Sequence, residues 1–117
     1  MTLLMLLEMV ASAFGERLAV GTRTGGLTYQ QLHDRAGAGA EVLRRHGAQH
    51  VAYVGTSDVV FPVALFASAW AGVPFLPLNY RLSDDQLREL LATHADVLVV
   101  ADDGAVERCR PLATTVV

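Results

Sequence analysis

The stretch Gly21-Thr22-Arg23-Thr24-Gly25-Gly26-Leu27-Thr28 contains the residue types of a phosphate-binding loop. Such loops follow the pattern Gly-x-x-x-x-Gly-Lys-Ser/Thr, in which the lysine neutralises the β- and γ-phosphates of a nucleotide. Leu27 takes the place of that lysine, and all nine basic residues of the chain are arginines. The sequence therefore favours a plain hairpin turn, whose glycines supply the positive φ angles that such turns need.

The segment Gly55-Thr56-Ser57-Asp58 reads as a turn from a strand into a helix, where backbone N–H groups can bind an anion or a serine can act as a nucleophile. Asp58 would repel a phosphate at this position, and the second glycine of a nucleophile elbow is absent. We therefore predict that Ser57 or Asp58 caps the helix that follows.

Metal and thiol chemistry find little support. No two of the four histidines share a ligand spacing on one helix, so no metal site is assigned to His33, His46, His50 or His94. Cys109 is the only cysteine, which excludes an intramolecular disulfide and fits a reducing cytoplasm. With no recognisable base partner, this thiol is expected to be inert.

Two pairs of acidic residues have structural explanations. Asp84-Asp85 is expected at a helix start, where acids stabilise the helix dipole, and Asp102-Asp103 in a turn after a strand. Acidic residues after a strand also occur in phospho-receiver domains, but the chemistry of that fold uses a lysine, which this chain lacks.

The composition limits the chain to one domain or less and excludes several partners. It has 117 residues, of which 52% are hydrophobic, with a net charge of −3. Soluble domains are usually about 45–50% apolar, so the excess is typical of a piece of a larger protein. Because acidic and basic residues are interspersed, there is no basic surface for nucleic acid or an anionic membrane.

Two apolar segments are long enough to be considered as membrane segments. Met1 to Phe14 has no basic residue before its apolar part and is interrupted by Glu8, which favours an amphipathic helix over a signal peptide. Val59 to Leu78 carries no charge and approaches the ~20 residues needed to span a bilayer. Its proline and glycine residues favour a buried helix followed by a buried strand, with a transmembrane span as the minor alternative.

Alternating helix and strand signals predict an α/β fold, an open and mostly parallel sheet with flanking helices and right-handed crossovers. Capping boxes are expected at Thr28 with Gln31 and at Ser83 with Gln86. The expected helices are Met1 to Phe14, Thr28 to Gly47, Asp58 to Ala71, Ser83 to His94 and Ala105 to Arg110. The expected strands are Leu18 to Val20, Leu27-Thr28, Val51 to Val54, Phe75 to Leu78, Val97 to Val100 and Thr114 to Val117.

Packing expectations follow from this pattern. Gly37-Ala38-Gly39 is expected to allow a helix to pack closely against the sheet, and Trp70 and Tyr80 to pack in the core and at its rim. The helix from Asp58 to Ala71 is apolar nearly all round, a pattern typical of a helix buried on all sides. Because a single small sheet covers only one face of it, its other faces are expected to take part in self-association of the isolated chain. A single core is expected to contain Leu27, Leu32, Val54, Phe75, Leu76, Leu91, Leu98 and Val99.

Three motifs in register resemble the adenylate-forming acyl-CoA synthetases, the fatty-acid-CoA ligases of the AMP-binding enzyme family. They are Leu6-Leu7-Glu8-Met9-Val10-Ala11 through Ala19-Val20, then Leu27-Thr28-Tyr29-Gln30-Gln31-Leu32, and finally the run Ala69-Trp70-Ala71-Gly72-Val73-Pro74-Phe75-Leu76-Pro77-Leu78-Asn79-Tyr80-Arg81-Leu82. Where this family usually keeps a longer loop before a strand, the chain has only Ala48-Gln49-His50. The resemblance implies that residues 1–117 form a single α/β subdomain, an incomplete N-terminal portion of the family's large AMP-binding domain.

The resemblance also implies a function for a longer protein. The full-length enzyme would activate a carboxylate with ATP and Mg²⁺ as an acyl-adenylate and transfer it to CoA. The family's catalytic and ATP-binding motifs lie beyond residue 117, so no catalytic, cofactor-binding or metal-binding residue is assigned here, and the chain is expected to be inactive alone. Its expected partners are the remainder of the synthetase or further copies of itself in a homo-oligomer. The alternative is a stand-alone, non-catalytic interaction or dimerisation module.

Overall fold

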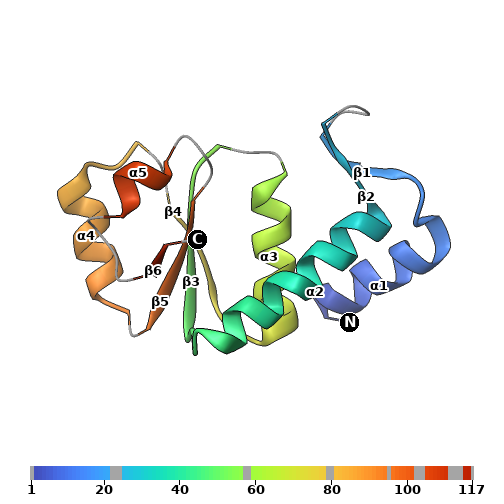
Figure 1. The fold of residues 1–117 in the computed structure, drawn as a ribbon, viewed down its shortest axis with the longest axis horizontal. Helices are drawn as coiled ribbons and strands as arrows, with labels where there is room; N and C mark the ends of the chain where they lie inside the picture. The colour runs from blue at the N-terminus through green and yellow to red at the C-terminus, as the bar shows by residue number, and fades with distance from the viewer. Residues whose placement is uncertain are drawn as a thin grey trace.

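A computed structural model gives the fold of the chain (Figure 1) and describes residues 2–21, 25–56, 59–78, 81–94, 96–101, 105–110 and 115–116. The helices are α1 (Leu3–Phe14), α2 (Tyr29–Arg45), α3 (Val60–Ala71), α4 (Asp84–Ala92) and α5 (Val106–Cys109). The strands are β1 (Leu18–Val20), β2 (Leu27–Thr28), β3 (His50–Val54), β4 (Phe75–Leu78), β5 (Val97–Ala101) and β6 (Thr115–Val116).

The main sheet has the strand order β4-β3-β5-β6, and every neighbouring pair is parallel. In its register Val51 of β3 lies opposite both Phe75 of β4 and Leu98 of β5. Helices α2 and α3 lie on one side of this sheet and α4 and α5 on the other (Figure 1). The predicted α/β fold with an open parallel sheet is confirmed.

The two N-terminal strands form a separate antiparallel hairpin, as expected. Leu18 of β1 pairs with Thr28 of β2, and Gly21 begins the connection with φ +74°, a backbone conformation that favours glycine. Residues 22–24, in the middle of the segment that resembles a phosphate loop, lie outside the described residues.

Both predicted capping boxes are present. The Thr28 hydroxyl accepts from the N–H of Gln31 at 3.2 Å, and the Gln31 side-chain oxygen accepts from the N–H of Thr28 at 2.9 Å. Ser83 and Gln86 repeat the arrangement at the start of α4, with the same distances. Each box satisfies backbone donors that the first helical turn leaves without partners.

Helix α3 begins later than the sequence suggested. Its first residue is Val60 and its N-cap residue is Val59, while Ser57 and Asp58, the predicted capping residues, lie outside the described residues. The helix ends as predicted, because Gly72 adopts the left-handed conformation with φ +72°. No helix among the described residues is long and apolar enough to cross a membrane.

The expectation of one core is wrong, because the apolar side chains form three clusters. Along β5, successive side chains point to opposite faces of the sheet, so Val99 packs with α4 and α5 while Leu98 packs with α2 and α3. The third cluster lies between helices and contains Leu7, Leu32 and Ala36. Of the other predicted core residues, Val54, Leu76 and Leu91 belong with Val99, Phe75 belongs with Leu98, and Leu27 is buried in β2.

Helix α3 is only partly covered, as expected, whereas the glycine pair of α2 packs against this helix instead of the sheet. Only Ala64, Ala67 and Ser68 of α3 are buried. A Cβ atom at Gly37 would lie 2.9 Å from Cη2 of Trp70, and one at Gly39 would lie 2.9 Å from Cβ of Ala67. The two glycines therefore set the distance between α2 and α3. Trp70 is half-buried and packs on the third cluster, whereas Tyr80 lies outside the described residues.

Candidate functional site

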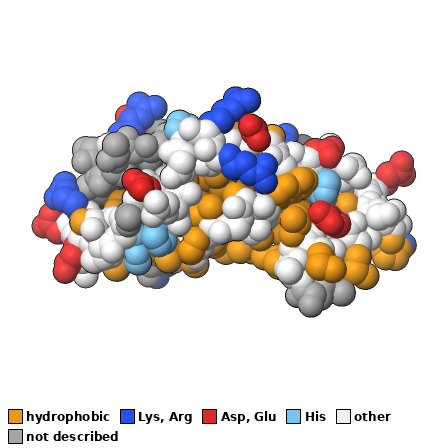
Figure 2. Space-filling view, turned by 90° about the horizontal axis from the view of Figure 1, so that it is seen from below, with side chains coloured by type: hydrophobic (Ala, Val, Ile, Leu, Met, Phe, Trp, Pro, Cys, Tyr) orange, Lys and Arg blue, Asp and Glu red, His pale blue; other side chains and the backbone are white. Residues whose placement is uncertain are grey.

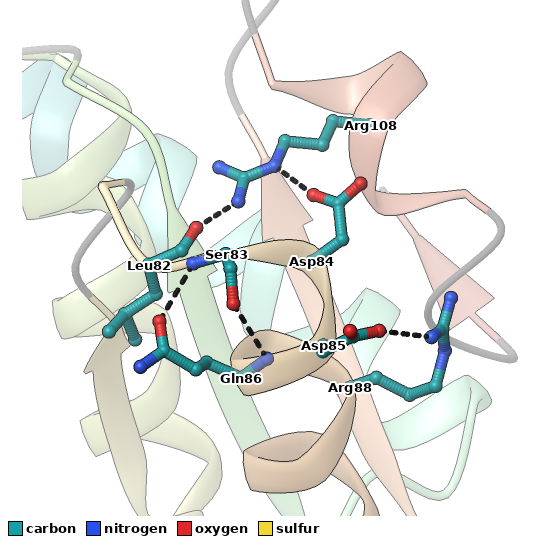
Figure 3. Close-up of polar contacts among 7 residues, drawn as sticks. All are labelled: Leu82, Ser83, Asp84, Asp85, Gln86, Arg88 and Arg108. Atoms are coloured by element: carbon teal, nitrogen blue, oxygen red, sulfur yellow. Dashed lines mark hydrogen bonds and ion pairs between the residues drawn. The ribbon is translucent and has the colours of Figure 1, made fainter.

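A group of polar side chains surrounds the start of α4, near the end of the sheet at which the parallel strands finish (Figure 3). Asp84 and Asp85 lie in the first turn of α4, as predicted, where negative charge offsets the positive end of the helix dipole. Asp85 also pairs with Arg88 one turn later, at 3.1 Å between Oδ1 and Nη1. Both members of this second pair are exposed, so it contributes little to stability.

Arg108 of α5 connects two distant segments at this point. Its Nε lies 2.6 Å from Oδ1 of Asp84, and its Nη2 donates a hydrogen bond to the carbonyl oxygen of Leu82 (Figure 3). The Arg108 side chain is 31% exposed, compared with 61% for Asp84. Because α4 follows β4 and α5 follows β5, this contact joins the two segments that leave the carboxyl ends of these strands.

The carboxyl end of a parallel sheet is where α/β proteins usually bind ligands, in the crevice beyond the strands. The crevice is expected between β3 and β5, because the chain passes from β3 to β4 on one side of the sheet and then crosses to β5 on the other. Thr56 lies just after β3 at this point. The acidic residues that follow β5, Asp102 and Asp103, lie outside the described residues. Arg108 donates hydrogen bonds to Asp84 and to the Leu82 carbonyl oxygen, and these contacts link α5 to the start of α4.

Two of the four histidines are brought together although they are far apart in the sequence. The rings of His50, at the start of β3, and His94, after α4, have centroids 5.0 Å apart. A search for ligand spacing along one helix misses this pair, because the residues come from two different elements. Among the described residues, no group of three or more His, Cys, Asp or Glu side chains could hold a metal ion.

Cys109 and His33 have packing roles. Cys109 is 1% exposed and lies in the cluster formed by the sheet with α4 and α5. The His33 ring packs against Trp70 in a tilted arrangement, with ring centroids 4.9 Å apart. Its Nδ1 lies 3.7 Å from Oδ1 of Asp34 and has no hydrogen-bond partner among the described residues.

Comparison with known proteins gives a consistent family. The model of the AMP-binding enzyme family matches residues 7–116. The mitochondrial malonate–CoA ligase of Mus musculus is 32% identical over 111 residues, covering 88% of this chain and 19% of the ligase. Feruloyl-CoA synthase from an Amycolatopsis species is 39% identical over 93 residues, covering 74% of this chain and 19% of that enzyme.

Solved structures agree with these matches. A crystal structure named as a long-chain-fatty-acid CoA ligase from Rhodopseudomonas palustris superposes with a TM-score of 0.84 at 27% identity. The superposition covers 96% of this chain and 29% of that one. The chain thus spans about a fifth of the length of the two curated relatives above. The family match extends over nearly all of its residues, and the chain belongs to the AMP-binding enzyme family.

Proposed function

We propose that this chain is the N-terminal scaffold subdomain of an ATP-dependent acyl-CoA ligase. The observation that carries the proposal is the family match over residues 7–116, together with relatives that are named as CoA ligases and extend far beyond the matched region. In the longer protein, the activity would be conversion of a carboxylic acid to its CoA thioester with ATP and Mg²⁺. The proposed substrate is a fatty acid or a related carboxylic acid. The proposed location of the protein is a reducing cytoplasm.

We further propose that the chain takes no direct part in the chemistry. It has no lysine to neutralise nucleotide phosphates. Arg108 lies near the carboxyl ends of the parallel strands, where it contacts Asp84 and the Leu82 carbonyl oxygen. These observations support a role in which the described residues hold the carboxyl end of the sheet in place for segments that carry the reactive groups.

Two measurements test the proposal. The mass of the native protein in cell extract, detected with an antibody against this chain, is expected to be several times 12.5 kDa. That longer protein, purified, is expected to catalyse ATP–pyrophosphate exchange that depends on an added acid. A panel of fatty, aromatic and dicarboxylic acids identifies the substrate class. A long native protein that shows no exchange with any of these acids would contradict the proposed activity.

The alternative role, a stand-alone interaction or dimerisation module, is favoured by the exposed apolar side chains of α1, which include Met5 and Met9. The same mass measurement separates the two roles, because a native protein of 12.5 kDa would leave the module as the better explanation.

A further inference from the structure

A cavity of about 210 Å³ lies between α2, α3 and the face of the main sheet. Its wall is built mainly of apolar side chains, among them Val42 of α2, Val63 of α3 and Val100 of β5. Among the described residues that line it, Arg35 carries the one charge. One water occupies ~30 Å³ in the liquid, so the cavity has room for side chains.

The outer face of α1 has the opposite character, apolar and exposed. Met5, Leu6 and Met9 are 51%, 47% and 55% exposed, and residues three and four apart on a helix lie side by side. Glu8 lies beside Met5 and Met9 along the same shallow depression of this helix. Single exposed apolar residues are normal on a protein surface, whereas a contiguous row of them along one helix forms an apolar patch of the kind that interaction surfaces use.

The two surfaces have complementary charges. Glu8 is the one acidic residue of α1, and Arg35 is the one charged residue on the cavity wall. Neither side chain has an ion-pair partner among the described residues. Figure 2 shows hydrophobic side chains gathered over the middle of the lower face of the molecule, with arginine side chains beside them.

The outer face of α1 cannot fill the cavity of its own chain, because α1 packs against α2 and α3 through its opposite side, with Leu7 and Ala11 buried. We propose that the cavity receives α1 from a second copy of this chain, with Met5 and Met9 entering it and Glu8 meeting Arg35. Methionine suits this contact because its flexible side chain fills irregular apolar spaces. The contact joins two different surfaces, so two copies form a closed dimer when both contacts are made.

A charge exchange tests the proposal on the 117-residue chain. Sedimentation velocity at micromolar concentration is expected to show association of the unaltered protein. Glu8→Arg or Arg35→Glu alone places like charges together and is expected to weaken association about tenfold or more. An equal mixture of the two variants is expected to recover it, because each contact then joins opposite charges. The controls are Glu16→Arg, just after α1, and Arg44→Glu, on α2, which are expected to leave association unchanged.

A second variant keeps the test independent of charge. Met5→Ser with Met9→Ser removes exposed side chains, so the fold is expected to remain intact by circular dichroism while association is lost. A monomer of 12.5 kDa at all concentrations for the unaltered chain would overturn the proposal. Association that survives both the charge reversals and the methionine substitutions would also overturn it, since another surface would then be responsible.

Discussion

Arg108 lies 2.6 Å from Asp84, a residue 24 positions earlier in the chain, and this contact fastens α5 to the first turn of α4. The same guanidinium donates to the carbonyl of Leu82. A local stretch of sequence does not reveal this contact, because Asp84 begins α4 and the rest of α4 and all of β5 separate it from Arg108.

Replacing Arg108 with alanine is expected to lower the free energy of unfolding by about 1 kcal/mol, since a partly exposed ion pair and a hydrogen bond to a carbonyl are lost together. The matched control is Arg88→Ala, which breaks the exposed pair with Asp85 and is expected to change stability by less than about 0.5 kcal/mol. Urea unfolding followed by circular dichroism gives both values. Equal effects of the two substitutions would show that the contact across α4 and α5 has no special role.

The glycine pair of α2 leads to a packing prediction. Gly37→Ala would place a methyl group 2.9 Å from the Trp70 ring, so it is expected to destabilise the protein by about 1–3 kcal/mol through overpacking. Gly47→Ala is the comparison, because its added Cβ has nothing within 4 Å. Any loss of stability in that variant reports only the strain of placing alanine at a φ of +62°.

A double variant identifies the cause of that effect. If contact with the indole is responsible, Gly37→Ala combined with Trp70→Leu will be less destabilised than the sum of the two single variants. Additive effects in thermal unfolding would count against direct contact.

On one face of the sheet, truncation of an apolar side chain is expected to cost more in an interior strand than in an edge strand. Leu98→Ala, in the interior strand β5, is expected to cost about 3 kcal/mol, because this side chain is 2% exposed and leaves a cavity. Phe75→Ala, in the edge strand β4, is expected to cost less, about 2 kcal/mol, because Phe75 is only half-buried. Urea unfolding of both variants tests this order, and a larger loss for Phe75 would place it at the centre of the packing.

The isolated chain is expected to show no binding of ATP with Mg²⁺ in the micromolar range. It contains no lysine, and the arginine near the carboxyl edge of the sheet is held by Asp84. Isothermal titration calorimetry measures this directly, and a micromolar dissociation constant would contradict the assignment of a scaffold role.

Features encoded by neighbouring residues could be predicted from the sequence. The capping boxes at Thr28 and Ser83 are each complete within four residues, and both occur as expected. The apolar run of β5 gave the strand but not its division between two clusters, because a strand buried on both faces shows no polar alternation. The partner of Gly37 also depends on how α2 and α3 cross, which residues of α2 alone do not encode. The contact between His50 and His94 likewise depends on tertiary structure, because the two residues belong to different elements.

The order of elements along the chain has a consequence for synthesis on the ribosome. Residues 1–49 contain α1, the hairpin and α2, and all of them precede the first strand of the main sheet. Leu43 of α2 is buried against Val51 and Leu98, which are made later. At about 5–20 residues per second, this side of α2 stays without its sheet for several seconds. During that interval it is a surface that chaperones can recognise, so the nascent chain is most exposed to aggregation before β5 is complete.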